Sequence, residues 1–476
     1  MKGDKVVSGF LWRFMERFGA YAVSFVVSVI LARILDPEAY GTIALVTVFT
    51  NILQVFVESG LGRALVQKKE AEDIDFSSVF YFNMAVCLLL YCGLFAFAPY
   101  IAQFFNNIEL TSVIRVLGII LIISGLKNVQ QAYVSRKMLF KKFFYATLIG
   151  TLFSAVVGIC LAYWGAGVWA LVAQSLANAL VDTLMLWITV KWRPKKCFSL
   201  QRLKGLLSYG WKLLIAALVG SLSDNLRQLF IGKLYTSADL AFYNKGDQIP
   251  SIVNGNVNAA IDSVIFPVMA EAQDNKESVK NMTRRAITTS TYIMAPIYIG
   301  LACCAETLIR ILLTEKWLPC VPFLRIFCIT YLFYPIHTAN LNAILAVGRS
   351  DIDLKLELIK KLLEIMVLLL TMRYGVMAIA YGLIGTAILN QIINAWPNKE
   401  LIGYSYLEQI RDVLPEIALA CVMGAVVYFV GYLQLPDLTV LVLQIMVGIV
   451  VYLGLSALMR LEAFIYLLGK IKGRRK

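Results

Sequence analysis

Long apolar stretches recur along the whole chain and are separated by short polar connections. Most of them reach the ~20 residues that a helix needs to cross a hydrocarbon core about 30 Å thick. They do not alternate between polar and apolar residues, as the ~10-residue strands of a membrane β-barrel do. The pattern therefore predicts an all-α polytopic membrane protein.

This pattern predicts about fourteen transmembrane helices. Their expected positions are residues 14–35, 40–62, 78–104, 111–133, 143–164, 167–190, 206–233, 248–270, 286–312, 322–347, 356–373, 376–396, 412–433 and 438–459. The fourth, ninth and tenth spans carry charges, so we expect these three to be kinked or displaced.

The positions of Lys and Arg determine the expected orientation, because these residues gather in cytoplasmic connections. They fill the N-terminus, the connections after the even-numbered spans and the C-terminal tail GKIKGRRK. The intervening connections hold few of them, such as Arg33 and Lys233. With fourteen spans every basic segment falls on one side, so both termini are expected in the cytoplasm.

The composition agrees with a membrane protein. Of 476 residues, 59% are hydrophobic and only 16% are charged, too few for the surface of a soluble protein. The net charge of +14 follows from the same basic connections, so we expect no nucleic-acid partner. The nine cysteines lack the spacing of metal ligands or of a disulfide framework, and no metal site is expected.

A weak internal repeat of about 200 residues runs through the sequence. The stretch LARILDPEAYGTIALV, which begins at Leu31, corresponds to IGKLYTSADLAFYNKG, which begins at Ile231. Further along, VIRVLGIILIISGLKNVQQAYVSRK from Val113 resembles FLRIFCITYLFYPIHTANLNAILAVGR from Phe323. Each copy holds six spans, an even number, so the two copies have the same orientation, as in parallel-repeat transporters.

The repeat predicts two parallel six-helix bundles, residues 1–190 and 206–400, followed by residues 401–476 with two additional helices and a basic cytoplasmic tail. Between the bundles lies the segment 191–205, KWRPKKCFSLQRLKG. It mixes basic with apolar residues and is expected to be a cytoplasmic amphipathic linker along the membrane surface.

Four segments of the chain resemble bacterial polysaccharide flippases of the multidrug/oligosaccharidyl-lipid/polysaccharide exporter superfamily, in particular the colanic-acid and teichuronic-acid exporter type. These segments are ARILDPEAYGTIAL…ESGLGRALVQKK, RVLGIILIISGLKNVQQAYVSRKMLFKK, FPVMAEAQDNKESVKNMTRRA and NAILAVGRSDIDLK. The resemblance covers roughly residues 8–400. One departure is ESGL at 58–61, where the family often has Asp-Leu-Gly-Leu.

The resemblance implies two six-helix bundles around a V-shaped cavity, with two extra C-terminal helices. It also implies movement of undecaprenyl-diphosphate-linked oligosaccharide from the cytoplasmic to the periplasmic leaflet of the bacterial inner membrane. The partners would be this lipid-linked oligosaccharide and the membrane lipids, and polysaccharide polymerase and export proteins are candidate further partners.

Polar residues form a stripe on one face of the second span, where Asn51, Gln54 and Glu58 are spaced i, i+3, i+7. The eighth span carries a matching stripe, formed by Ser251, Asn254, Asn258 and Asp262. Polar side chains in a membrane usually face a bundle interior or a wet cavity. We interpret the two stripes as the lining of a central cavity. The alternative is that they form interhelical hydrogen bonds, worth about 0.6 kcal/mol each.

Candidate cations for a diphosphate headgroup lie near the cytoplasmic starts of the first and seventh spans, at Arg13, Arg17 and Lys212. The alternative for these residues is ordinary anchoring at the membrane surface. Asp224 and Arg227 are spaced i, i+3 and can form an ion pair, either structural or part of a switch. Acids that can bind a coupling ion are Asp182, Glu306, Glu364 and Glu416. The single histidine, His337, is expected to be a packing residue.

The expected mechanism is a rocking of the two bundles that exposes the cavity to each side in turn. No phosphate-binding loop appears in the sequence, so H⁺ or Na⁺ is the expected coupling ion and no other cofactor is expected. An enzyme is not expected, since outward loops are short and acids such as Asp36 and Glu109 are isolated. The alternative function is a multidrug/cation antiporter of the same superfamily, whose cavity would hold more acids than bases.

Overall fold

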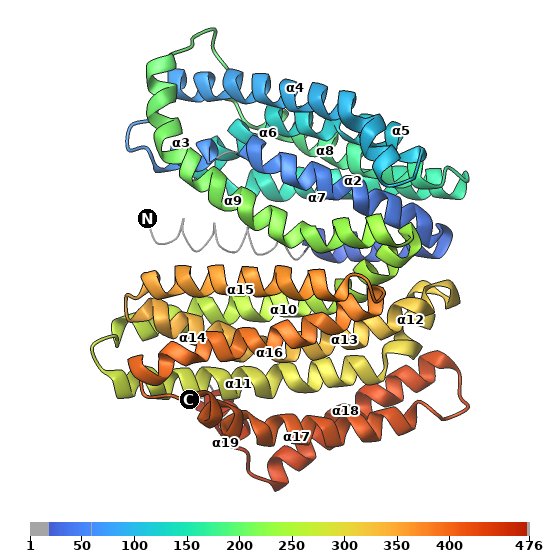
Figure 1. Ribbon diagram of the computed structural model, residues 1–476, viewed down its shortest axis with the longest axis vertical. Coiled ribbons are helices and arrows are strands. Elements are labelled where there is room, and N and C mark those ends of the chain that lie inside the picture. The colour runs from blue at the N-terminus through green and yellow to red at the C-terminus, as the bar shows by residue number, and fades with distance from the viewer. Residues whose placement is uncertain (1–18, 59, 474–476) are drawn as a thin grey trace. The chain divides into compact units, whose positions relative to one another are not determined.

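The computed structural model describes residues 19–58 and 60–473, apart from the side chains of residues 209, 212, 259–264 and 470–473 (Figure 1). Helices and short connections make up this part of the chain, and it contains no β-strand. Contacts divide the chain into two compact units, Met1–Ala241 and Phe242–Lys476, called here the N-terminal and the C-terminal unit. The bundle and linker boundaries inferred from the repeat stay a prediction.

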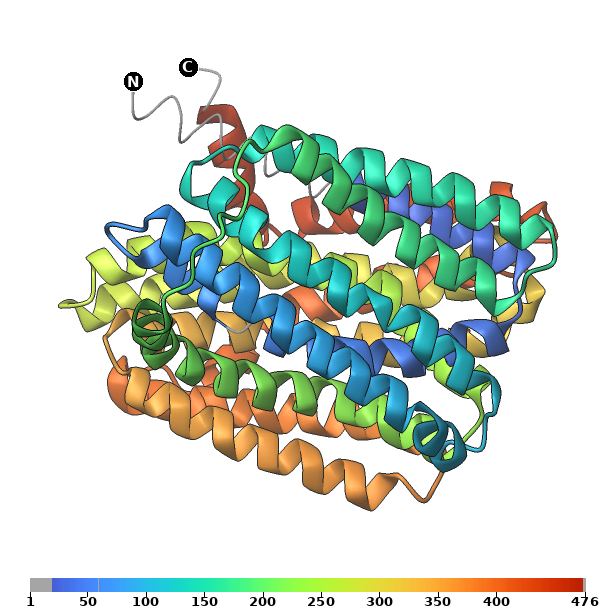
Figure 2. The same cartoon turned by 90° about the horizontal axis from the view of Figure 1, so that it is seen from above.

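The N-terminal unit begins with an apolar helix, Gly19–Ile34, and a hinge at Leu35 and Asp36. Pro37 then opens the next helix, a position that suits its fixed φ and missing N–H. The helices that follow run largely side by side (Figure 2). They are α2 (Pro37–Glu58), α3 (Leu61–Gln67), α4 (Asp73–Phe104), α5 (Glu109–Leu117), α6 (Ile119–Arg136), α7 (Phe140–Tyr163), α8 (Val168–Thr189) and α9 (Leu200–Leu234).

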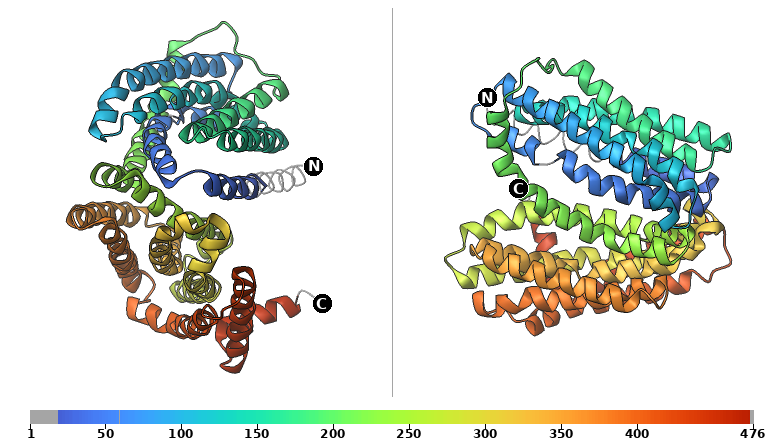
Figure 3. Two further views of the ribbon diagram at one scale, coloured as in Figure 1. Left: turned by 90° about the vertical axis from the view of Figure 1, so that its right-hand side faces the viewer. Right: turned by 45° about the horizontal axis from the view of Figure 1, so that its top comes forward.

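Helix α10 (Ser237–Glu271) leads into the C-terminal unit after a second hinge at Tyr235 and Thr236. The two hinges lie at matching places of the internal repeat. The long helices of this unit are seen nearly end-on in the left panel of Figure 3. They and the shorter elements are α11 (Lys276–Cys303), α12 (Ala305–Leu313), the 3-10 helix η1 (Glu315–Cys320), α13 (Val321–Leu332), α14 (Tyr334–Ala346), α15 (Ser350–Thr371), α16 (Val376–Leu401), α17 (Tyr406–Val430), α18 (Asp437–Leu458) and α19 (Glu462–Gly473).

The predicted fold class, an all-α polytopic membrane protein, is confirmed. Within the described residues, 11 helical segments are long and apolar enough to cross a membrane. Helices α10 and α15 are also long but more polar, and Gly19–Ile34 is a shorter apolar helix, so a total of fourteen spans is consistent with the structure. All three charged spans are broken, at Gly118 between α5 and α6, at Cys304 between α11 and α12, and at Phe333 between α13 and α14.

The internal repeat reappears as matching contacts inside each unit. Arg115 Nε donates a hydrogen bond to the Phe95 carbonyl, 3.4 Å away, and its repeat partner Arg325 donates to the Ala302 carbonyl at 3.2 Å. In both units the arginine therefore binds a backbone carbonyl of the preceding long helix.

A second pair of contacts joins α6 to α2 in the N-terminal unit and α14 to α10 in the C-terminal unit. Asn128 on α6 donates to the Val57 carbonyl of α2, and Thr338 on α14 donates to Asn258 Oδ1 of α10 at 3.2 Å. Asn128 and Thr338 are opposite each other in the repeat. Both contacts join the helix that carries the polar stripe to a later helix of the same unit.

Glycines allow α2 to pack closely against α9 and the start of α10. A Cβ atom added to Gly232 would lie 2.1 Å from Leu45 Cδ2, and one added to Gly41 would lie 1.7 Å from the Ser237 carbonyl oxygen. No side chain fits at such distances. Small residues at helix contacts let backbones approach in membranes, where packing rather than the hydrophobic effect drives association.

Candidate functional site

The headgroup cations predicted from the sequence fall mostly outside the described part of the chain. Arg13 and Arg17 lie outside the described residues, and so do the side chains of Lys212 and Asp262. On α9, Asp224 is exposed and Arg227 is half-buried. The roles assigned to these six residues stay predictions.

The two predicted polar stripes differ in their surroundings. Gln54 on α2 is half-buried and Glu58 is exposed, whereas Asn254 and Asn258 on α10 are both buried. Asn258 Nδ2 donates to Asn254 Oδ1 at 2.6 Å, and Asn258 Oδ1 accepts from Thr338 of α14. The α10 stripe therefore makes hydrogen bonds within its own unit, as the interhelical alternative expects. Whether the stripes also line a transport cavity stays a prediction.

A short ion pair lies inside the N-terminal unit, between α6 and α8. Lys127 Nζ is 2.6 Å from Asp182 Oδ2, with 25% and 11% of the two side chains exposed. From the sequence, Asp182 was one of four acids that can bind a coupling ion, and no partner was expected for it. Its bond to Lys127 gives this carboxylate a fixed cation from the protein itself.

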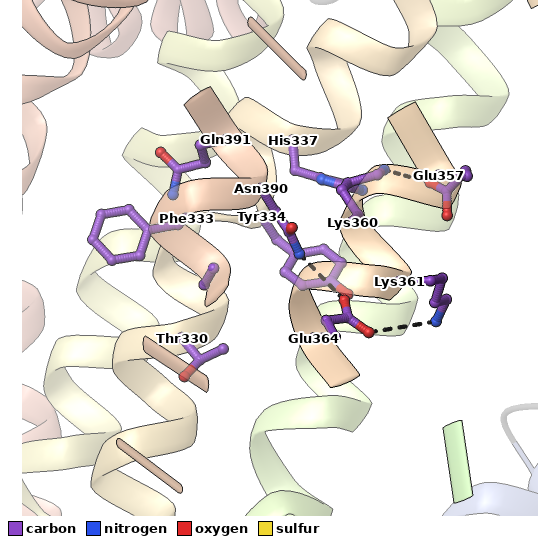
Figure 4. Close-up of a pocket in the computed structure, with 11 residues that line it drawn as sticks. Thr330, Phe333, Tyr334, His337, Glu357, Lys360, Lys361, Glu364, Asn390 and Gln391 are labelled. Carbon is purple, nitrogen blue, oxygen red and sulfur yellow. Dashed lines mark hydrogen bonds and ion pairs between the residues drawn. The ribbon is translucent and has the colours of Figure 1, made fainter. Parts of the chain in front are cut away.

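A polar pocket opens in the C-terminal unit between α13, α14, α15 and α16 (Figure 4). Its cavity volume is about 150 Å³. The lining combines carboxylates, ammonium groups, carboxamides, one imidazole and two aromatic rings. The residues are Thr330, Phe333, Tyr334, His337, Glu357, Lys360, Lys361, Glu364, Ala387, Asn390 and Gln391.

Helix α15 supplies all four charges of this polar pocket. Glu357, Lys360, Lys361 and Glu364 are spaced i, i+3, i+4, i+7, so they share one face of the helix. Figure 4 shows Lys360 beside His337 and Glu364 beside Asn390, with Glu357 and Lys361 farther out. Lys360 forms an ion pair with Glu357, and Lys361 Nζ lies 3.6 Å from Glu364 Oε2. Each carboxylate of the lining thus has an ammonium partner on the same helix.

Helices α14 and α16 complete the polar pocket with neutral groups. Asn390 Nδ2 donates to Glu364 Oε1 at 3.3 Å. His337 lies against the Tyr334 ring, with 5.4 Å between ring centroids, and its Nδ1 is 2.7 Å from Asn394 Nδ2. His337, which we expected only to pack, therefore also lines a cavity.

The sequence did not reveal this pocket, because Lys360 and Lys361 follow other basic residues after the tenth span. We counted both lysines with the basic residues of a cytoplasmic connection, although the expected span begins at residue 356. The signal that could have revealed the pocket is the spacing of two glutamates and two lysines on one face of a helix whose following residues are apolar.

A second charged cluster fastens the segment 191–205 to the N-terminal end of α4. Lys195 Nζ lies 2.6 Å from Asp73 Oδ2, and Arg202 lies 2.7 Å from Glu72 and 3.4 Å from Asp75. The hydrogen bond that Lys195 donates to Asp73 raises the pKa of Lys195, and the one that Arg202 donates to Glu72 raises the pKa of Arg202. Backbone N–H groups of this segment also donate to Ser77 and Ser78 of α4. The segment is therefore docked on the unit rather than attached only by its ends.

Comparison with known proteins gives the chain a context. Residues 30–322 match a family described as "Polysaccharide biosynthesis protein". The succinoglycan biosynthesis transport protein ExoT of Rhizobium meliloti (strain 1021) is 27% identical over 67% of this chain, and the match spans 65% of ExoT, slightly less than two thirds of its length. The teichuronic acid biosynthesis protein TuaB of Bacillus subtilis (strain 168) is 24% identical over 90% of this chain and 89% of its own.

The fold also matches a solved structure. The lipid II flippase MurJ, in an inward closed conformation, has a TM-score of 0.77 with this chain at 15% identity. The match covers 94% of this chain and 98% of the MurJ chain. At this identity the likeness concerns the fold alone.

Proposed function

Because the chain belongs to the family of polysaccharide biosynthesis proteins, we propose that it is a flippase that moves undecaprenyl-diphosphate-linked oligosaccharide across the bacterial cytoplasmic membrane. The chain is a multi-pass integral membrane protein with the fold of MurJ, which is named as a lipid II flippase. ExoT, a relative by sequence, is named as a transport protein for succinoglycan biosynthesis. The observation that carries the proposal is the family match over residues 30–322 in a chain of this fold.

The cargo determines what the protein has to supply. Each hydroxyl of a saccharide that enters hydrocarbon without a hydrogen bond costs several kcal/mol, roughly 4–8 in a solvent that cannot hydrogen-bond. A flippase therefore needs polar side chains at membrane depth, whereas the prenyl chain can stay in lipid. Both units hold polar side chains between their helices, at Lys127 and Asp182 and in the polar pocket.

The cycle is proposed to be alternating access of one polar path to the two sides of the membrane, driven by H⁺ or Na⁺. Arg13, Arg17 and Lys212 are proposed to receive the diphosphate, with both termini in the cytoplasm. Glu58 is proposed to line the path from the α2 side. The step is a movement without covalent chemistry, and polymerase and export proteins would act on the delivered glycan.

The test is complementation of a deletion strain. Loss of the gene is expected to stop polysaccharide export and to cause prenyl-diphosphate-linked glycan to accumulate on the cytoplasmic leaflet, and the wild-type chain is expected to restore export. A triple variant, Arg13→Gln, Glu58→Gln and Lys212→Gln, is expected to insert normally but to restore little export. Normal export by this variant would refute the assignment of these residues. A deletion strain that exports normally but becomes drug-sensitive would favour the antiporter instead.

A further inference from the structure

We propose that the polar pocket of the C-terminal unit binds one uncharged sugar ring of the cargo, an inference that rests on the proposed function. The pocket would then take part in saccharide recognition, separately from the cations proposed for the diphosphate. Size, hydrogen-bonding capacity and charge balance each support this inference.

The volume of the polar pocket suits a single ring. About 150 Å³ is well below the ~300–1,000 Å³ of sites for drug-sized ligands, so a chain of several sugars does not fit inside. The cavity is also large for the one or two ordered waters that commonly fill buried polar sites, since a water occupies about 30 Å³ in the liquid. A ligand of roughly hexose size fills it.

The lining offers hydrogen-bonding groups that have no partner among the described residues. Gln391, 1% exposed, has its Nε2 donor unpaired, and Asn390 has its Oδ1 acceptor unpaired. Buried polar atoms are nearly always paired in native proteins, so such atoms beside a cavity indicate a missing partner. A sugar hydroxyl both donates and accepts, and one ring can satisfy both amides at once. The rings of Phe333 and Tyr334 offer apolar surface to the C–H groups of the same sugar.

The charges of the polar pocket argue for a neutral ligand. Among the described lining residues, two lysines and two glutamates balance, and each lysine lies beside a glutamate on α15. A uronic acid or a diphosphate would bring an uncompensated charge into a partly buried site, which is costly. A neutral hexose leaves both ion pairs intact and can hydrogen-bond to their charged groups.

The experiment measures binding of simple glycosides to the full-length protein in lipid nanodiscs by saturation-transfer NMR. Methyl α-D-glucopyranoside and methyl β-D-galactopyranoside are the neutral probes, and methyl glucuronide is the charged one. We expect at least one neutral glycoside to bind, and the glucuronide to bind about ten-fold more weakly or not at all. Gln391→Leu and Asn390→Leu are each expected to weaken binding about ten-fold, as loss of a buried hydrogen bond does.

Two further variants keep the test decisive. Ala387→Leu fills the cavity without removing a polar partner, so it is expected to abolish binding even where the amide variants fold poorly. Asn83→Leu is the matched control, because Asn83 is a buried amide with unpaired atoms on α4, in the other unit. Its glycoside binding is expected to equal that of the wild type.

The outcomes separate this inference from the proposed function. If the wild type and Ala387→Leu restore export equally and neither binds a glycoside, the pocket holds only water and the inference is overturned while the flippase stands. If the wild type binds a neutral glycoside but neither restores export nor moves prenyl-linked glycan in proteoliposomes, the proposed function fails and the pocket remains a saccharide site. Preferential binding of the glucuronide would overturn the neutral-ligand assignment.

Discussion

Lys127 and Asp182 form an ion pair at 2.6 Å that joins α6 to α8 within the N-terminal unit. The repeat places Lys127 opposite His337, whose Nδ1 lies 2.7 Å from Asn394 Nδ2, so that a contact at this position also joins α14 to α16 in the C-terminal unit. One unit therefore uses opposite charges where the other uses neutral hydrogen-bonding groups. The fastening of corresponding helices is kept between the two repeats, while the chemistry that provides it differs.

Removing one member of the Lys127–Asp182 pair is expected to destabilise the protein. Lys127→Met leaves a largely buried carboxylate without its cation, and Asp182→Leu leaves the ammonium group without its anion. We expect each single variant to lower the free energy of unfolding by about 2–4 kcal/mol, less than for a fully dry pair because Lys127 is 25% exposed. Thermal unfolding of the purified protein in detergent measures the effect.

The double variant Lys127→Met/Asp182→Leu is the control for this pair. Apolar replacement of both partners of a buried ion pair is often neutral, so stability is expected to return toward that of the wild type. If the losses of the two single variants simply add in the double variant, the residues do not interact as the structure shows.

Gly232 is expected to be required for the packing of α9 against α2. Gly232→Leu would force a side chain into the space of Leu45, and overpacking of this kind costs about 1–3 kcal/mol or more. We expect a lower unfolding temperature and reduced yield in the membrane, measured by fluorescence-detected chromatography after heating.

Gly220→Leu provides a matched substitution on the same helix. A Cβ atom added at Gly220 meets nothing within 4 Å, and leucine has a better helix propensity than glycine. This variant is expected to unfold at the wild-type temperature or slightly above. Equal destabilisation by both substitutions would mean that helix α9 does not approach α2 at Gly232.

Asp75 is expected to hold the segment 191–205 on the N-terminal unit. Its carboxylate accepts from Lys68 at 2.7 Å and lies 3.4 Å from Arg202, with the Asp75 side chain fully buried. Asp75→Asn removes the charge and one acceptor oxygen, at a cost of about 1–3 kcal/mol. Hydrogen exchange at residues 191–199 is expected to become faster in this variant, as detected by mass spectrometry of peptic peptides.

The comparison for that variant is Asp73→Asn, two residues away. Asp73 and Lys195 are both largely exposed, and an exposed ion pair contributes little to stability. We expect little change in exchange at residues 191–199. Faster exchange in Asp73→Asn than in Asp75→Asn would show that surface charge, not the buried carboxylate, retains the segment.

The sequence was sufficient to predict features that depend on neighbouring residues. The hinge before Pro37 and its counterpart before Ser237 follow from polar residues between apolar runs, and the structure has helix ends at both places. The breaks in the three charged spans were likewise expected from charge in apolar surroundings. These signals are local, because the membrane requires each span to satisfy its own backbone.

The polar pocket could not be predicted in the same way. Glu364 is among the acids that the sequence offers for a coupling ion, but its partners are Lys361, in the basic stretch after the tenth span, and Asn390, on another helix. Which charges neutralise one another depends on helix rotation and on contacts between distant segments. Periodicity shows that residues share a face, but not which element this face meets.

Asn258 provides the sharpest test of how the α10 stripe is used. Its side chain accepts from Thr338, so Asn258→Leu and Thr338→Val each remove the same interhelical hydrogen bond, worth about 0.6 kcal/mol on average in membranes. If the stripe only makes hydrogen bonds, both variants should keep polysaccharide export, and Asn258→Leu should be the less stable because it also removes the hydrogen bond to Asn254 Oδ1. If Asn258 also contacts cargo, Asn258→Leu should lose most export while Thr338→Val retains it, since only the first removes a polar group from the stripe. Export in the deletion strain, normalised to the amount of protein in the membrane, measures the difference. We expect the second result, and equal export by the two variants would leave the hydrogen bond as the whole role of Asn258.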